Sequence, residues 1–273
     1  MKSGTTNNNS NDASNIDLDS TSQLSEKQIK QFHQNGFLVI PSQTSEKTLK
    51  QWQDHAKYML NNAQPPWELE SDLGYPGAPS HESKEGIHTV RRLLRVYERD
   101  SVWREWAHSP VIITPIKQLL NTEQICLSQN HHNCLMTKAP RFSSDTGWHQ
   151  DIRYWSFHDG ELITAWLALG KETSEMGSIH VIPGSQKETL RAEQFDQALF
   201  FTEQHPDNKR LIAKEQAIEL NAGDVLLFDS RLLHRASRNR TEKTKLSLVF
   251  TYRRSTNQPL SGSRSSLLDD ICL

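Results

Sequence analysis

Hydrophobic and polar positions follow a helical pattern early in this chain and a strand-like pattern later. In the stretch LSEKQIKQFHQNGFLVI, Ser25 is placed to cap a helix, Gln28 completes a capping box and Gly36 provides a stop. The apolar run Phe37–Ile40 predicts a strand directly after this helix. Thr44 begins a second predicted helix, whose rough apolar stripe consists of Leu49, Trp52, Ala56, Tyr58 and Met59.

The second half of the chain changes to short, β-rich segments separated by turn residues. Two further helices are predicted before them, near Ser101–Ala107 and Pro110–Leu120. The predicted strand segments are QICLSQNHHNCLMTK, LITAWLALG, SIHVIPGS, QAIELNAGDVLLFD and LSLVFTYR. Helices followed by strands predict an α+β chain whose strand-rich half forms a sandwich or jelly roll.

Two segments lack this periodicity. Residues 1–23 contain almost no apolar side chains, so we expect a disordered N-terminal tail before a single domain spanning residues 24–273. Residues 62–86 are rich in Pro, Gly, Ser and charge, which predicts a long flexible loop. Because loops of this length in compact domains are usually functional or disordered, a mobile flap over a pocket is one interpretation.

The overall composition is that of a globular protein. The chain has 273 residues, 35% of them hydrophobic and 23% charged, and a net charge of −2 that gives no general attraction to nucleic acid or an acidic membrane surface. It has no apolar run long enough to cross a bilayer and a polar start, so we expect a cytoplasmic protein with neither membrane nor nucleic-acid partners. Cys126, Cys134 and Cys272 lack metal or redox spacing and are expected to be reduced, mostly structural thiols.

Candidate chemistry begins in the stretch TGWHQDIRYW. On an extended strand His149 and Asp151 project to the same face, as two ligands of one metal ion must. A polar patch on a half-buried strand accounts for the same letters. A third ligand is available about eighty residues later, where His234 follows a turn and the buried strand Val225–Phe228. Two imidazoles and one carboxylate on one side of a metal are typical of non-haem Fe(II) oxygenases.

An ordered series of motifs resembles the phytanoyl-CoA dioxygenase-like branch of the Fe(II)/2-oxoglutarate oxygenases. The series runs from about Leu24 to Arg253 and contains FHQNGFLVIP, MTKAP, GWHQD, AWLAL, GSIHVIPGSQK, GDVLLFDSRLLH and NRT. The resemblance implies a double-stranded β-helix of the jelly-roll, cupin-like kind with flanking N-terminal helices. It also implies Fe(II) held by His149, Asp151 and His234, with 2-oxoglutarate and O2 as cosubstrates. The implied reaction hydroxylates a small organic molecule and converts 2-oxoglutarate to succinate and CO2.

Some positions of the family pattern are matched ambiguously. Trp166 falls where relatives place a tryptophan beside the cosubstrate, and a core tryptophan of a central strand explains it equally well. His132 matches a pocket-lining position of some relatives, although an ordinary strand histidine is the simpler interpretation. The serine that usually lies two residues after the distal histidine is replaced here by Ala236, with Ser237 next.

The largest departure concerns the far carboxylate of 2-oxoglutarate. Relatives usually bind it with an arginine about eleven residues after the distal histidine, and that position is Lys245 here. An inward-facing ammonium at the start of an apolar strand needs an anionic partner, and Ser247 shares its strand face and offers a hydroxyl. A solvated, outward lysine is the alternative, in which case Arg240 is the substitute cation.

The sequence contains less information about the substrate than about the metal site. Arg153, Tyr154 and Trp155 directly follow the first two ligands and are candidates to contact it, Arg153 through an anionic group. A packed strand with a surface arginine is the competing interpretation. Halogenases on the same scaffold have Ala or Gly in place of the carboxylate, so Asp151 argues against halogenation. A non-catalytic β-sandwich that binds a metal or ligand is the remaining alternative, and the sequence does not indicate an oligomeric state.

Overall fold

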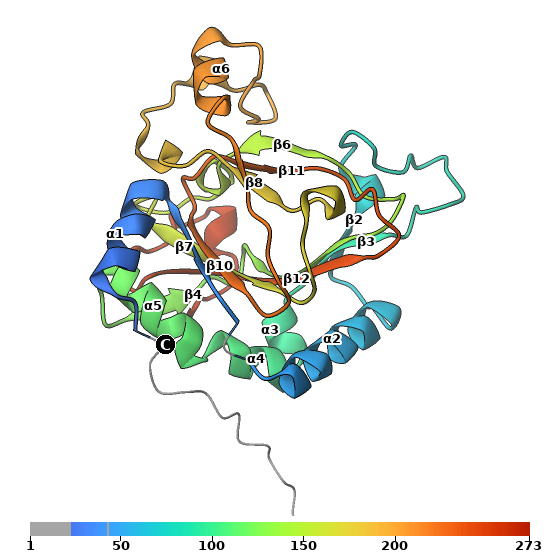
Figure 1. Ribbon diagram of the computed structural model, residues 1–273, viewed down its shortest axis with the longest axis horizontal. Helices are drawn as coiled ribbons and strands as arrows, with labels where there is room; N and C mark the ends of the chain where they lie inside the picture. Colours follow the sequence, from blue (N-terminus) through green and yellow to red (C-terminus); the bar gives the residue numbers. More distant parts are fainter. Residues whose placement is uncertain (1–22, 43) are drawn as a thin grey trace, which may run out of the picture.

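The computed structural model describes residues 23–42 and 44–273 of the chain (Figure 1). Its first helix, α1 (Glu26–Asn35), has the predicted capping box of Ser25 and Gln28. Gly36 ends it in the left-handed region, with φ 84°, a conformation that glycine adopts without steric cost. The predicted strand follows as β1 (Phe37–Ile40), and Ser45 caps α2 (Glu46–Asn61). The predicted disordered tail, apart from Gln23, lies outside the described residues.

The strands of the described residues form two antiparallel sheets. The larger, nine-stranded sheet has the order β1-β10-β7-β12-β5-β3-β2, with β4 pairing β12 and β13 pairing β4. Its remaining strands are β2 (Trp67–Leu69), β3 (Val90–Leu94), β4 (Ile125–Leu127), β5 (Asn133–Lys138), β7 (Leu162–Ala168), β10 (Val225–Asp229), β12 (Lys245–Arg254) and β13 (Ile271–Cys272). The smaller sheet has the order β6-β11-β8-β9. It consists of β6 (Thr146–His149), β11 (His234–Ala236), β8 (Ile179–Val181) and β9 (Gln216–Ala217).

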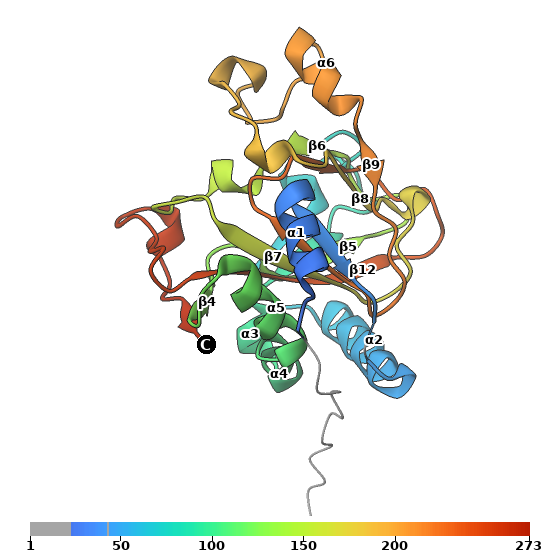
Figure 2. The ribbon, with the colours of Figure 1, turned by 60° about the vertical axis from the view of Figure 1, so that its left-hand side comes forward.

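The larger sheet lies between a helical layer and the smaller sheet, an arrangement visible in both views (Figures 1 and 2). The helical layer contains α2, α3 (Val96–Arg99), α4 (Ser101–Ala107) and α5 (Pro110–Leu120), while α6 (Pro206–Ile212) lies beyond the smaller sheet. One hydrophobic core packs helix residues such as Trp52 and Ile116 against Leu248 of the larger sheet. A second core lies between the sheets and includes Phe228 and Val181. No helix of the described residues is long and apolar enough to span a membrane.

This architecture confirms the predicted α+β fold with a jelly-roll core and N-terminal helices. Burying both faces of the central strands explains why β7 and β10 read as continuous apolar runs rather than alternating ones. The smaller sheet is short-stranded, and its strands β6 and β11 bring the predicted metal ligands side by side across one ladder.

The segment 62–86 is only partly the loop that the sequence predicts. Residues Trp67–Leu69 form β2, which pairs with β3, and a short 3-10 helix follows at Glu70–Asp72. The side chain of Glu70 is fully buried, and its carboxylate accepts hydrogen bonds from the Ser144 N–H and hydroxyl. The prediction was wrong for these residues because three-residue edge strands have no recognisable periodicity.

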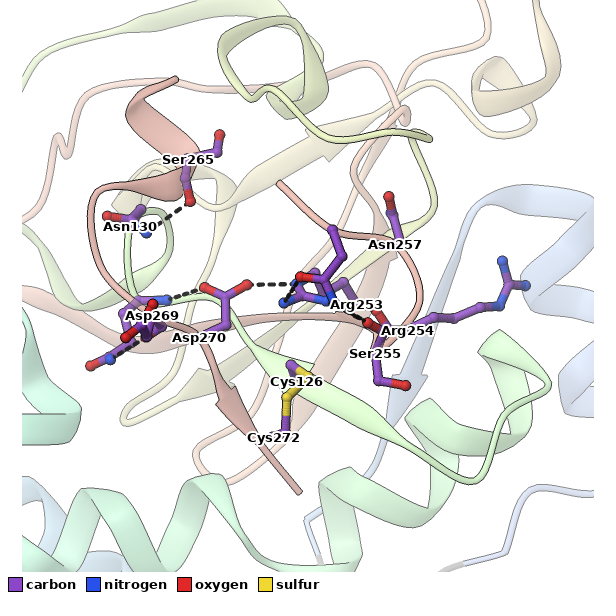
Figure 3. Close-up of polar contacts among 12 residues, drawn as sticks. Cys126, Asn130, Arg253, Arg254, Ser255, Asn257, Ser265, Asp269, Asp270 and Cys272 are labelled. Atoms are coloured by element: carbon purple, nitrogen blue, oxygen red, sulfur yellow. Dashed lines mark hydrogen bonds and ion pairs between the residues drawn. A yellow bond between two sulfur atoms is a disulfide. The ribbon is translucent and has the colours of Figure 1, made fainter. Parts of the chain in front are cut away.

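The prediction of reduced cysteines is wrong for two of the three. Cys126 of β4 and Cys272 of β13 form a disulfide, although 146 positions separate them in sequence (Figure 3). They are direct partners in the β4–β13 ladder, which only the folded sheet reveals. Cys134 is a free, buried thiol as expected.

Candidate metal centre and active site

Three predicted ligands converge where the smaller sheet faces the larger one. His149 ends β6 and is the direct antiparallel partner of His234, which begins β11. Residues directly opposite each other across a ladder share a face, and the two imidazole centroids are 4.1 Å apart. Asp151 follows at the start of a 3-10 helix (Asp151–Tyr154). One donor atom from each of the three lies within 4.8 Å of the others.

Hydrogen bonds to the backbone fix the orientation of both imidazoles. The Nδ1 of His149 lies 2.9 Å from the Gly147 carbonyl, and the Nδ1 of His234 lies 2.9 Å from the Leu232 carbonyl. Because a carbonyl oxygen only accepts, each Nδ1 carries a proton, and in the neutral form of each ring Nε2 then keeps the lone pair that a metal would bind. These Nε2 atoms lie 3.7 and 3.9 Å from Asp151 Oδ1. A hydrogen bond from Nδ1 to a backbone carbonyl is a usual way in which proteins orient a histidine that binds metal through Nε2.

Burial leaves the polar atoms of this centre in need of a ligand. Burial lowers the pKa of His149 well below its ordinary value, and the neighbouring His234 adds to this effect, so His149 is neutral at neutral pH. Asp151 Oδ2 is buried without a hydrogen-bond partner among the described residues, as is His132 Nδ1 3.7 Å away. Two neutral nitrogens and a carboxylate, with their lone pairs pointing together, fit a divalent transition metal such as Fe(II).

The strand argument for the first pair needs a correction. β6 ends at His149, so Asp151 does not lie on the same strand face. Gln150 is extended and the chain then turns into the 3-10 helix, which brings the carboxylate back toward the histidines. The sequence correctly predicted that His149 and Asp151 lie close together, but a turn rather than a shared strand face brings them together.

An inner cavity of about 60 Å³ leads from the histidines into the space between the sheets. Since one water needs roughly 10–15 Å³ of such space, the cavity has room for about four to six water-sized groups. Trp166 and His132 line it, as the resemblance implied. The other lining residues are Arg91, Arg92, Met136, Thr137, Lys138, Thr146, His149, Ile179, Phe228, His234, Arg235, Ala236 and Lys245.

Lys245 faces this cavity and has the anionic partner that its burial requires. The partner is Glu172, whose Oε2 lies 3.0 Å from Lys245 Nζ, and both side chains are almost fully buried. Ser247 donates to the same carboxylate at 2.6 Å, and Trp166 Nε1 donates at 3.1 Å. The backbone of Glu172 is fixed by two hydrogen bonds with Leu220. A carboxylate of the chain itself therefore neutralises the lysine expected to bind 2-oxoglutarate.

Lys138 is the cross-strand partner of Lys245 and has a different environment. Its ammonium donates to the Ser144 carbonyl at 2.7 Å, and no carboxylate of the described residues lies within 4 Å. Burial, reinforced by the charges of Lys245 and Arg91, lowers the pKa of Lys138 to about 7. An anion entering the inner cavity would meet Lys138 as a buried cation without an ion-pair partner.

An outer cavity of about 390 Å³ is lined by His149, Asp151 and His132. This volume is within the range of sites for small organic ligands. Tyr154 and Trp155 line it, while Arg153 does not. Arg153 Nε donates to Gln150 and its guanidinium stacks on Phe195, with 3.6 Å between the guanidinium carbon and the ring centroid. The alternative cation Arg240 is exposed and lines neither cavity.

The sequence reasoning missed several residues of this site. Glu172 gave no motif signal, although an inward Lys245 required some anion nearby, and Lys138 stands in the MTKAP motif but was assigned no role. Arg91 and Arg92 line both cavities from β3, a strand that the sequence did not predict. Arg91 is 2.6 Å from Glu68 and also bonds Thr146, which fixes it in place.

Comparison with known proteins supports this geometry. A family model described as phytanoyl-CoA dioxygenase (PhyH) matches residues 32–247. The probable phytanoyl-CoA dioxygenase of Caenorhabditis elegans is 23% identical over 240 residues, which cover 84% of this chain and 75% of that protein. The L-proline trans-4-hydroxylase of Streptomyces griseoviridis is 24% identical over 211 residues, which cover 68% of this chain and 75% of that protein.

Solved structures show the same fold. The crystal structure of EctD from S. alaskensis with bound Fe superimposes with a TM-score of 0.72 at 20% identity. The superposition covers 89% of this chain and 82% of that one. The epimerase SnoN, in complex with Fe3+ and alpha ketoglutarate, gives a TM-score of 0.69 at 17% identity, covering 86% and 85% of the two chains.

Proposed function

Because the chain belongs to the phytanoyl-CoA dioxygenase (PhyH) family of Fe(II)/2-oxoglutarate oxygenases, we propose that it hydroxylates a small organic molecule. One observation carries the proposal. The donor atoms of His149, Asp151 and His234 lie within 4.8 Å of one another where two cavities meet, since His149 lines both cavities, His234 the inner one and Asp151 the outer one. Such a three-residue set leaves the opposite coordination positions free for a cosubstrate and dioxygen.

The chain's own residues would divide the work around this centre. His149, Asp151 and His234 would hold the metal, and the backbone carbonyls of Gly147 and Leu232 would keep the imidazoles oriented. When bound, Fe(II) and 2-oxoglutarate supply the oxidising chemistry, which consumes O2, yields succinate and CO2 and hydroxylates the substrate. The inner cavity would receive the cosubstrate and the outer cavity the substrate.

The far carboxylate of 2-oxoglutarate would be received at the Lys138–Lys245 pair. Both ammonium groups line the inner cavity. Because Lys245 already forms an ion pair with Glu172, Lys138 would bind the cosubstrate carboxylate more strongly. Thr137 and Ser247 are less able to help by donation, because their hydroxyls already donate to the Val90 carbonyl and to Glu172. Trp166 would form a wall beside the cosubstrate, and His132 would border the metal.

The test combines iron binding with product analysis. His149→Ala, Asp151→Ala and His234→Ala should each bind Fe(II) at least about tenfold more weakly and lose Fe(II)-dependent succinate formation from 2-oxoglutarate, since each removes one ligand. His158→Ala, at an exposed histidine that lines neither cavity, is the matched control. Full iron binding and turnover in all three ligand variants would refute the assignment. Iron and 2-oxoglutarate binding without any succinate formation would favour the non-catalytic alternative.

A further inference from the structure

The C-terminal segment 260–273, here called the C-terminal strap, lies beyond the residues that match the family model, which end at residue 247. It runs back along the turn that connects β4 to β5 (Figure 3). Asn130 donates to the carbonyls of Ser265 and Leu268 at 2.9 and 2.8 Å and accepts from the Leu268 N–H. The disulfide between Cys126 and Cys272 fixes its end.

A buried ion pair also holds the strap against the larger sheet. Asp270 Oδ2 is 2.5 Å from Nε of Arg253 in β12, and the two side chains are 1% and 3% exposed (Figure 3). The other carboxylate oxygen of Asp270 accepts from the Gln129 N–H. The buried ion pair, the hydrogen bonds of Asn130 and the disulfide therefore attach the strap to β4, β12 and the turn after β4.

The strap forms one wall of the outer cavity. Arg264, Leu267 and Leu268 line the cavity from the strap. Leu267 is 74% exposed, which is unusual for a large apolar side chain and leaves apolar surface at the cavity mouth. Trp155 adds an aromatic wall, stacked on His131 with 4.7 Å between ring centroids.

The charges of the outer cavity are predominantly positive. Four arginines line it, against the two carboxylates Glu68 and Asp151. Glu68 is already engaged by Arg91 and Arg92, at 2.6 and 3.5 Å, and Asp151 faces the metal centre. The other two arginines, Arg95 and Arg264, have no carboxylate within 4 Å among the described residues.

Arg95 and Arg264 reach this cavity from different parts of the chain. Arg95 precedes α3 and has a left-handed backbone with φ 57°, which residues with a side chain adopt rarely and mostly where structure or function requires it. Arg264 comes from the strap, a segment far in sequence from the other residues that line the cavity. The chain as a whole has a net charge of −2, so the excess of positive charge is a local property.

We propose that the outer cavity binds a substrate with one anionic group and an apolar portion, and that Arg264 and Arg95 receive the anionic group. The apolar portion would lie along Leu267 and Trp155 toward the metal centre. This proposal rests on the proposed function for the identity of the bound molecule as substrate. It moves the anion-binding role from Arg153, which packs on Phe195, to two arginines that face the cavity.

The test uses pairs of probes that differ only in charge. Butanoate, hexanoate and octanoate are titrated by calorimetry against the corresponding neutral amides, using protein loaded with Fe(II) and 2-oxoglutarate under nitrogen. The bound cosubstrate blocks the inner-cavity lysines as a rival carboxylate site. Because an exposed ion pair contributes up to a factor of about five, we expect the two arginines together to favour the carboxylate by up to about 25-fold. The preference should shrink as ionic strength rises.

Variants locate the source of the preference. Arg264→Gln and Arg95→Gln should each reduce it, and the double variant should abolish it, while Arg240→Gln should leave it unchanged because Arg240 lines neither cavity. Absence of a charge preference at every chain length, or its persistence in the double variant, would overturn the proposal. In the same titrations without Fe(II) and 2-oxoglutarate, the inner-cavity lysines are open to the probes, so only the part of the preference that Arg264→Gln and Arg95→Gln remove reports on the outer cavity. A failure of the proposed function would appear in cosubstrate binding and leave this arginine-dependent part unchanged.

Discussion

Lys138 of β5 and Lys245 of β12 are cross-strand partners, and among the described residues Lys245 has a neighbouring carboxylate that Lys138 lacks. Lys245 has Glu172 at 3.0 Å, whereas Lys138 has only the Ser144 carbonyl. Desolvation without a compensating anion disfavours the charged ammonium, which is why burial lowers the pKa of Lys138 to about 7. Near neutral pH, the protonation state of Lys138 therefore depends on whether an anion enters the inner cavity.

We predict that 2-oxoglutarate binding weakens as pH rises above about 7. The bound carboxylate favours the protonated lysine, and the free protein loses that proton as pH passes the lowered pKa, so binding then requires proton uptake. The dissociation constant should rise by up to about tenfold per pH unit above 7. Calorimetry with Fe(II)-loaded protein under nitrogen at pH 6.5, 7.5 and 8.5 measures it. In the free protein the same lowered pKa reduces folding stability below the ordinary lysine pKa, and this cost increases as pH falls toward 7.

Two variants provide the controls for this pH dependence. Lys138→Met should bind 2-oxoglutarate about 10- to 150-fold more weakly at pH 6.5, the effect of a lost charge-assisted hydrogen bond, and should show a flat profile between pH 6.5 and 8.5. Glu172→Gln removes the competing carboxylate beside Lys245 and should tighten binding while lowering stability, because a buried ammonium loses its partner. An unchanged profile in Lys138→Met would return the role to Lys245.

At the residue scale, the sequence predicted the cluster of candidate metal ligands better than its surroundings. His149, Asp151 and His234 were identifiable because they stand in a motif with a known spacing. The cost of an unpaired charge in an apolar strand predicted that Lys245 would need an anionic partner if it faced inward, and the sequence left the outward orientation open. Glu172 could not be paired with Lys245, because it lies 73 positions away in a connection without a motif.

At the scale of elements, prediction succeeded where local chemistry marks the ends. The helices α1, α4 and α5 have the predicted bounds because capping side chains mark their N-termini. The short strands β2 and β13 were missed, since two or three residues show no periodicity and form strands only by pairing with a neighbour. The helix α6 was likewise not predicted.

The β4–β13 ladder leads to a prediction about stability. In protein purified without reductant, Cys126 and Cys272 should be protected from alkylation, and reducing their disulfide should lower the free energy of unfolding by about 2–4 kcal/mol, because the reduced unfolded chain is less constrained. Thermal unfolding with and without reductant measures this loss. A Cys126→Ser, Cys272→Ser double variant should resemble the reduced protein and be insensitive to reductant. Three reactive thiols in the denatured, never-reduced protein would contradict the pairing.

At the scale of the whole molecule, the site depends on pairings between distant segments. β6 and β11 are neighbours in the smaller sheet although 84 positions lie between His149, the last residue of β6, and His234, the first of β11. The larger sheet likewise places β5 beside β12. Periodicity predicts strands but not their order. The jelly-roll arrangement was predicted because an ordered series of motifs resembled a known family, and the strap lay outside that series.

The same arrangement narrows the predicted flap to the part of residues 62–86 that follows the 3-10 helix. Residues 67–72 are held by the β2–β3 ladder and by buried Glu70, whereas Leu73 and Tyr75 line the outer cavity. Beyond them the backbone hydrogen bonds are mostly local turns, with one tie from the Asp145 N–H to the Pro76 carbonyl. Few long-range bonds make this stretch the part of the cavity wall that opens most readily.

We therefore predict that hydrogen exchange in residues 73–86 is fast in the free protein and slows when both cavities are filled. Fe(II), 2-oxoglutarate and the carboxylate that binds most tightly in the probe titrations are the ligands, and mass spectrometry follows the peptides. Residues 67–72 should exchange slowly in both states because they belong to the sheet. α6 is the internal control, since it lines neither cavity and should not respond. Equal exchange of residues 73–86 with and without ligands would contradict a flap in this part of the cavity wall.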